Sequence, residues 1–177
     1  MKKKNILVTG AGKGIGLATT KKLLEDGNYV FAIIRDKKDN KKFDNYENLK
    51  IFNANIKNYK FIEKVLTYSH KIKKPITGLV NNAGIRQRKK FLKISSNDLK
   101  EIFTTNFFAA FKIMQIFTNS LIKKKLKGSI VNIASIVGQN GFSELSAYGA
   151  TKGALISLTK SFAKEFGKKT AIHCSGP

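Results

Sequence analysis

The chain alternates between short runs of β-branched residues and longer segments whose apolar residues recur every three or four positions. The short runs are predicted strands and cover residues 5–9, 27–34, 49–54, 77–81 and 128–134. The periodic segments are predicted helices and cover residues 17–26, 58–73, 97–125 and the segment from Tyr148 to Phe166. Residues 36–48 are polar and charged and predict a weak helix at best. Asn106 interrupts the third periodic segment, which therefore predicts either one long helix or two.

Strand and helix segments alternate along the whole chain, with crossovers long enough to join parallel strands. This order predicts a doubly wound parallel sheet of about six strands with helices on both faces, a three-layer α/β/α fold. Ligands of such sheets bind beyond the carboxyl ends of the strands. The residues expected at these ends are Thr9, Arg35, Asn55, Asn81 and Ser135.

A glycine-rich turn, Gly10-Ala-Gly-Lys-Gly-Ile-Gly16, follows the first strand and leads into a helix. Glycines allow a pyrophosphate to approach the backbone, and the helix N-terminus adds N–H donors and a positive dipole. The alternative is a purely structural turn, but the strand-turn-helix context favours a phosphate cradle. We therefore expect residues 1–177 to form one dinucleotide-binding and catalytic domain.

The end of the second strand predicts which dinucleotide binds. Many dinucleotide folds have an acidic residue here that holds the ribose 2′-hydroxyl, but Ile34 occupies that position. Arg35 follows, and Lys13 of the glycine turn is expected near the same point, so a 2′-phosphate is favoured and NADP(H) is expected over NAD(H). Asp36 would serve a ribose instead if the strand ended one residue later.

Tyr148 and Lys152 lie one helical turn apart, on one face of the last predicted helix. The pKa of a free tyrosine is about 10, and lowering it to neutrality takes about 4 kcal/mol. An ammonium about 4 Å away supplies about this much at an effective dielectric near 20. The pair predicts a phenol poised for proton transfer, with Ser135 at a strand end placed to hold a carbonyl oxygen. The alternative for such a pair alone is a solvated helix face.

The net charge of +23 at pH 7 raises the alternative of nucleic-acid or acidic-membrane binding. The lysines are spread along the chain, arginine is scarce, and Asn, Ile and Phe are abundant too, which favours a compositional bias over a binding surface. We expect no nucleic-acid or membrane partner. The single cysteine and the lack of a signal peptide predict a cytoplasmic protein. Two isolated histidines make a metal site improbable.

Together these motifs resemble the short-chain dehydrogenase/reductase family. The matching residues are Thr9-Gly10-x-x-x-Gly14-Ile15-Gly16, Asn81-Asn82-Ala83-Gly84, Asn106, Ser135 and Tyr148-x-x-x-Lys152. They occur in the family's order and at family-like separations, and they cover nearly all of the chain. The resemblance implies an oxidoreductase that transfers hydride between a nicotinamide cofactor and a ketone or secondary alcohol.

The resemblance also implies roles for individual residues. Tyr148 would be the acid in reduction and the base in oxidation, Lys152 would lower its pKa and bind the nicotinamide ribose, and Ser135 would orient the substrate oxygen. Asn106 would help to hold a water that relays protons. Cofactor contacts are expected from Thr9, Gly10, Gly12, Lys13, Gly14, Ile15, Gly16, Arg35, Asn55, Ile56, Asn82, Ala83 and Gly84, and from Tyr148 and Lys152.

Two positions depart from the family pattern. Asn55 stands where the family usually has Asp, although its carbonyl can still accept a hydrogen bond from adenine. The tail, Ala171 to Pro177, ends Gly-Pro where the family has a Pro-Gly turn followed by a substrate loop, a helix and a seventh strand. The resemblance therefore predicts that a last helix and strand are missing, and an alternative function is a nucleotide-binding module without turnover.

The segments around Ser135 and Tyr148 look most like 3-oxoacyl-carrier-protein reductases, whereas Ile85-Arg-Gln-Arg-Lys-Lys-Phe91 is similar to gluconate 5-dehydrogenases. The expected substrate is therefore a small or carrier-bound carbonyl compound of one of these two types. In the family, the helices that carry Asn106 and Tyr148 form a subunit interface. A homodimer through these two helices is expected.

Overall fold

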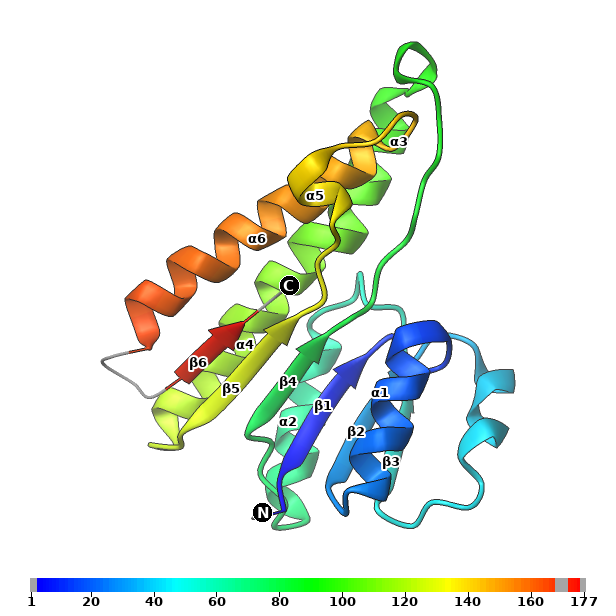
Figure 1. The fold of residues 1–177 in the computed structure, drawn as a ribbon. Helices are drawn as coiled ribbons and strands as arrows, with labels where there is room; N and C mark the ends of the chain where they lie inside the picture. Colours follow the sequence, from blue (N-terminus) through cyan, green and yellow to red (C-terminus); the bar gives the residue numbers. More distant parts are fainter. Residues whose placement is uncertain (1–2, 168–171, 176–177) are drawn as a thin grey trace.

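Six parallel strands form one sheet in the order β3-β2-β1-β4-β5-β6 (Figure 1). The computed structural model describes residues 3–167 and 172–175, so Ala171, Gly176 and Pro177 of the tail lie outside the described residues. The strands are β1 Asn5–Thr9, β2 Tyr29–Ile34, β3 Leu49–Asn53, β4 Gly78–Asn81, β5 Gly128–Asn132 and β6 Ile172–Ser175. The strand order reverses between β1 and β4, where a doubly wound sheet opens its ligand crevice.

Helices connect the strands, and their bounds follow the predicted periodic segments closely. They are α1 Gly14–Glu25, η1 Lys37–Phe43, α2 Phe61–Lys71, η2 Phe91–Lys93, α3 Ser96–Phe103, η3 Thr104–Phe108, α4 Ala109–Lys123, α5 Val137–Asn140 and α6 Ser146–Phe166. The polar stretch after β2 forms a 3-10 helix. The segment after Ser135 contains the short helix α5.

The two faces of the sheet pack against different helices, as the alternation of side chains along a strand requires. Leu7 and Phe31 lie in a core with residues of α2, α4 and α6, whereas Val8 and Val30 lie in a second core with residues of α1 and η1. Figure 1 shows these two helical layers on either side of the sheet. The predicted three-layer arrangement is confirmed.

On the face of the sheet that packs against α1, some strands are more exposed to solvent than others. Ile130 of β5 is buried in the core beneath α4, but its neighbour Val131, on the opposite face, is 36% exposed. The corresponding residue of β1, Val8, is fully buried. The described residues therefore cover β1 on both faces and β5 on one.

The long segment around Asn106 is two α-helices joined by one turn of π-helix, η3. Asn106 lies within this turn and is 1% exposed. A π-helical turn inside an α-helix is frequent at functional sites, so the interruption that the sequence suggested has a defined geometry. None of the helices described, α6 included, is long and apolar enough to cross a membrane.

Candidate functional site

A cavity of about 510 Å³ opens at the carboxyl ends of β1, β2 and β4. Most residues predicted to bind the cofactor line it: Gly10, Gly12, Lys13, Gly14, Ile15, Arg35, Asn55, Ile56, Asn82, Ala83 and Gly84. Thr9, Gly16, Ser135, Asn106, Tyr148 and Lys152 are not among its lining residues. The cavity thus occupies the position that a doubly wound sheet gives its ligand.

Gly16 of α1 is where the absence of a side chain matters most. A Cβ here would overlap the Gly10 carbonyl oxygen and the Asn82 side-chain nitrogen. That nitrogen donates to the carbonyls of Thr9 and Gly10, at 3.0 and 3.1 Å. The helix therefore begins directly against the end of β1, which leaves its first N–H groups facing the cavity edge.

Thr9 lies beneath this turn and is 1% exposed. Its hydroxyl accepts hydrogen bonds from the backbone N–H groups of Asn82 and Ala83, at 3.0 and 3.1 Å. It thereby ties the end of β1 to the turn after β4. The structure places Thr9 as a support for two cavity-lining residues, and its own contact with a cofactor stays a prediction.

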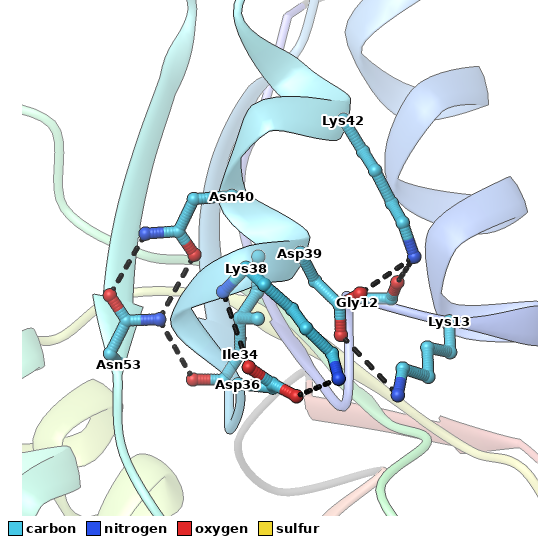
Figure 2. A network of polar contacts seen from close by, with 9 residues as sticks. All are labelled: Gly12, Lys13, Ile34, Asp36, Lys38, Asp39, Asn40, Lys42 and Asn53. Carbon is cyan, nitrogen blue, oxygen red and sulfur yellow. Dashed lines mark hydrogen bonds and ion pairs between the residues drawn. The ribbon is translucent and has the colours of Figure 1, made fainter.

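Charged side chains surround the end of the cavity near β2. The Lys13 side chain is 62% exposed, and Arg35 follows directly after β2, which ends at Ile34 as predicted. Asp36 begins η1, and its carboxylate accepts from the Lys38 backbone N–H at 3.2 Å and pairs with the Lys38 amine at 3.2 Å (Figure 2). Asp36 is therefore a helix cap in this structure.

The pKa of Asp36 reflects this capping position. Partial desolvation acts to raise the pKa of its carboxyl, but the hydrogen bonds from Lys38, and to a lesser extent the charge of Lys13, outweigh it and lower the pKa. Asp36 therefore carries its negative charge at neutral pH. It lines the cavity beside Arg35, so the two charges partly offset each other there.

Asp39 is a residue that the sequence reasoning missed. Its side chain is only 7% exposed, and its carboxylate lies 2.7 Å from the Lys42 amine and 3.8 Å from the Lys13 amine. The Lys42 amine also donates to the Gly12 carbonyl at 3.0 Å (Figure 2). The sequence signal was the spacing of Asp39 and Lys42, three residues apart, which allows an ion pair. Nothing in the neighbouring sequence indicated that this pair would contact the glycine turn.

The helix η1 is held to β3 by a pair of amides. Asn40 and Asn53 exchange two hydrogen bonds, of 2.9 and 3.0 Å, and Asn53 also donates to the Ile34 carbonyl at 3.3 Å (Figure 2). These contacts fix η1 against the ends of both β2 and β3. Asp39 is thereby held in place beside the glycine turn.

On the adenine side, Asn55 uses its side-chain oxygen to accept the Lys57 backbone N–H at 3.0 Å. An amide oxygen has two acceptor positions, so one remains for a ligand. Lys57 and Glu101 of α3, which both line the cavity, form an ion pair of 3.3 Å. This pair connects the loop after β3 with α3.

Asn106 joins three segments near the other end of the cavity. Its side-chain oxygen accepts the Ile85 backbone N–H at 2.8 Å, and its nitrogen donates to the Ile85 carbonyl at 2.9 Å and to the Thr151 hydroxyl at 3.1 Å. The Thr151 hydroxyl in turn donates to the Tyr148 carbonyl at 2.7 Å. The segment after β4 is thus fixed to η3 and to the first turn of α6.

Lys152 is 5% exposed, and its amine donates to the Ile133 carbonyl at 2.6 Å. The amine lies 5.8 Å from the centre of the Tyr148 ring. Burial lowers the pKa of Lys152 to about 8, so the amine is still mostly protonated at pH 7. A Cβ at Gly84 would lie 3.8 Å from this amine and 3.2 Å from the Asn106 oxygen, so both groups adjoin the cavity wall.

Ser135 lies beyond the end of β5, and its side-chain oxygen accepts the Val137 backbone N–H at 3.3 Å. The helix α5 that follows packs against α6 at very short range, because a Cβ at Gly138 would lie 2.7 Å from the Gly153 nitrogen. Small residues on both helices therefore keep the segment after Ser135 close to the turn that carries Lys152.

These features suit a dinucleotide. The cavity volume falls in the range of small-molecule sites, the glycine turn has no room for a side chain at Gly16, and cations stand at the end near β2. Among residues 3–167 and 172–175, no three His, Cys, Asp or Glu side chains gather to hold a metal ion.

Relatives in sequence carry names of reductases. A 3-amino-tetrahydro-pyrrolizinone reductase from Xenorhabdus hominickii is 35% identical over 167 residues, which cover 93% of this chain and 57% of the relative. The 3-oxoacyl-acyl-carrier-protein reductase FabG from Buchnera aphidicola is 32% identical over 164 residues, which cover 92% of this chain and 67% of the relative. The chain thus spans little more than half the length of the first.

Solved structures with the same fold include complexes with both nicotinamide dinucleotides. A 4-hydroxyisoleucine dehydrogenase complexed with NADH has a TM-score of 0.86 and 34% identity, covering 98% of this chain and 73% of that one. ElxO with NADP bound has a TM-score of 0.90 and 30% identity, and the match covers 99% of this chain and 72% of ElxO. A family model described as short chain dehydrogenase matches residues 4–176. The chain therefore belongs to the short-chain dehydrogenase/reductase family.

Proposed function

We propose that the protein is an NADP(H)-dependent oxidoreductase that interconverts a ketone and a secondary alcohol, with Tyr148 as the proton donor. The observation that carries this proposal is the buried Lys152 amine, charged at neutral pH and 5.8 Å from the Tyr148 ring, beside the wall of a dinucleotide-sized cavity. Burying a charged amine is costly, and this one lies near both the Tyr148 ring and the cavity wall, where it could assist proton transfer.

Each catalytic residue has a separate task in this proposal. The bound cofactor supplies or accepts the hydride. Tyr148 gives a proton to the carbonyl oxygen during reduction and removes it during oxidation. Ser135 donates a hydrogen bond to the same oxygen, and the Lys152 amine places a positive charge near the Tyr148 ring. Asn106 fixes the Ile85 backbone and Thr151, so it positions the segments on both sides of the reacting groups.

A preference for NADP(H) over NAD(H) rests on the cations at the end of the cavity near β2. Lys13 is largely exposed and Arg35 lines the cavity, so both can approach a 2′-phosphate. Asp36 caps η1 and pairs with Lys38, so both oxygens of its carboxylate already have partners within the protein. The structural relatives include both NADP-bound and NADH-bound proteins, so the preference depends on these residues of this chain.

The substrates we propose are a 3-oxoacyl thioester or a keto sugar acid. The first follows from the resemblance around Ser135 and Tyr148, and a 3-oxoacyl reductase is among the relatives. The second follows from the segment Ile85 to Phe91. Turnover of NADPH with each compound by the purified chain would distinguish the two.

A second candidate function is nucleotide binding without turnover. It is favoured by one observation: the cavity is lined by residues of the pyrophosphate and adenosine side and by none of the four predicted catalytic residues. Both functions predict NADPH binding, so only turnover separates them.

The test compares the wild-type chain with Tyr148→Phe. NADPH binding, measured by fluorescence titration, should agree within about twofold, whereas turnover should fall at least about 100-fold, because a positioned acid contributes about this much. Equal turnover in both would refute the role of Tyr148. Binding without turnover in the wild type would support the second function, and absence of binding would refute both.

We also propose a homodimer through the helices of Asn106 and Tyr148. Four aromatic residues, Phe103, Phe107, Phe108 and Phe111, contact one another along α3, η3 and α4. Phe108 is 53% exposed, which is unusual for a member of an aromatic cluster. Sedimentation should show a dimer for the wild type and a monomer for Phe108→Asp; identical behaviour of the two would contradict this interface.

A further inference from the structure

We infer that Asp39 sets the cofactor preference of this cavity by competing with the 2′-phosphate of NADP(H) for Lys13. This inference rests on the proposed function. It assigns a role to a residue that does not bind the cofactor directly but holds one that does. Asp39 is therefore a specificity-determining residue, and the preference for NADP(H) is weaker than Lys13 and Arg35 alone would give.

The geometry places one carboxylate between two amines (Figure 2). One oxygen of Asp39 lies 2.7 Å from the Lys42 amine, and the other lies 3.8 Å from the Lys13 amine. The carboxylate is 7% exposed and lies close to the Gly12 backbone, since a Cβ at Gly12 would lie 3.1 Å from it. Asp39 therefore has little freedom to turn away.

The two lysines differ in freedom. Lys42 is held by two partners, since its amine also donates to the Gly12 carbonyl at 3.0 Å. Lys13 has the looser contact of 3.8 Å, and its side chain is 62% exposed. A phosphate that enters this end of the cavity can therefore draw Lys13 away from Asp39, whereas Lys42 stays in place.

The Asp39 carboxylate and the 2′-phosphate of NADP(H) are both negatively charged. Asp39 lines the same cavity as Lys13 and Arg35, so a phosphate bound beside Arg35 would compete with its carboxylate for the Lys13 amine. A ribose hydroxyl has no charge, so NAD(H) is not affected in the same way. Loss of the Asp39 charge should therefore change the affinities for the two cofactors unequally.

Asp39→Asn is the decisive variant, because the amide keeps the shape and one acceptor oxygen but removes the charge. We expect it to bind NADPH about fivefold to tenfold more tightly and NADH about equally, since Lys13 would be free to pair with the phosphate and one such charge pair has about this effect. Fluorescence titration of the purified full chain with each cofactor measures both affinities. Asp39→Ser removes the same charge and leaves a smaller side chain. If only one of the two variants folds, that variant is enough for the test.

Two controls separate this role from a structural one. Asp44→Asn removes the same charge from the exposed end of the same short helix, outside the cavity, and should leave the NADPH/NADH ratio unchanged. Asp39→Glu keeps the charge, so its ratio of NADPH to NADH affinity should be close to that of the wild type. A purely structural Asp39 would change the binding of both cofactors together.

The route through Lys13 is tested by a double-mutant cycle. In a Lys13→Met background, Asp39→Asn should change NADPH affinity by less than half of its effect in the wild type. An unchanged NADPH/NADH ratio in Asp39→Asn, with both cofactors bound, would overturn the inference and leave the proposed function intact. Absence of binding of either cofactor by the wild type would overturn both.

Discussion

A lysine lies near each end of the cavity, and the two lysines are held in opposite ways. Lys13 is 62% exposed and has a carboxylate as its neighbour, whereas Lys152 is 5% exposed and binds a backbone carbonyl. Burial lowers the pKa of Lys152 to about 8. The ion pair of an exposed lysine with an acidic neighbour depends on salt concentration. The pKa of a buried lysine without such a neighbour depends on its desolvation.

The difference suits what each end is proposed to do. Recognition of a phosphate needs a flexible cation that can change partner, since the ligand arrives with its own charge. Proton transfer needs a cation at a fixed position relative to the reacting groups, because the interaction between two charges depends on their distance. The Ile133 carbonyl fixes the Lys152 amine at 2.6 Å without neutralising it.

The largest effect that follows from this comparison is on turnover. Lys152→Met should lower the rate of NADPH-dependent carbonyl reduction about 100-fold or more, because the proposed proton donor Tyr148 loses the positive charge beside it. Lys13→Met should change the maximal rate at saturating NADPH by less than about twofold, since its charge is remote from the reacting groups. Steady-state kinetics of both variants measure the difference, and equal losses of maximal rate would contradict it.

The next effect is on the pH dependence of stability. In the unfolded chain the pKa of Lys152 is 10.5 and in the folded chain it is about 8, so the folded chain binds fewer protons between these values. Burying the charged amine therefore costs about 3 kcal/mol below pH 8, and this cost disappears as the pH rises towards 10.5. Wild-type stability should rise over this range relative to Lys152→Met.

Urea unfolding at several pH values between 7 and 10 measures this difference. The variant also leaves the Ile133 carbonyl without its donor, but that loss is the same at every pH. A constant difference between the wild type and Lys152→Met across the range would show that the amine is not desolvated.

The smallest effect is on NADPH affinity. Lys13→Met should weaken NADPH binding about tenfold at low salt, and the loss should shrink in high salt, because the contact is exposed and screened. NADH binding should stay within about twofold. A loss of NADPH affinity that is independent of salt would mean that Lys13 acts through the shape of the glycine turn.

Much of this fold was predictable because its signals are local. The strand ends at Thr9 and Ile34 followed from β-branched runs that stop at polar residues, and the glycine turn followed from its spacing. Asn106 was recognised as an interruption because a polar residue stood inside an apolar helical pattern, and it lies in a π-helical turn.

The remaining features depend on contacts between distant segments. Nothing near Asp39 indicates that its carboxylate meets Lys13, 26 positions earlier in the chain, since a polar stretch is also typical of a solvated loop. The partner of Lys152 is a backbone carbonyl at Ile133, which any residue could provide. The helix α5 is too short for a periodic pattern. The need for a glycine at position 138 arises from its close contact with α6, which the local sequence does not indicate.

The uneven coverage of the sheet has a consequence for local unfolding. Val131 of β5 is 36% exposed on the face where Val8 of β1 is fully buried, so less apolar surface resists the separation of β5 from its neighbours. Backbone amides of β5 should therefore exchange with deuterium sooner than those of β1. Of these two strands, β5 would therefore open before β1, the strand that leads into the glycine turn.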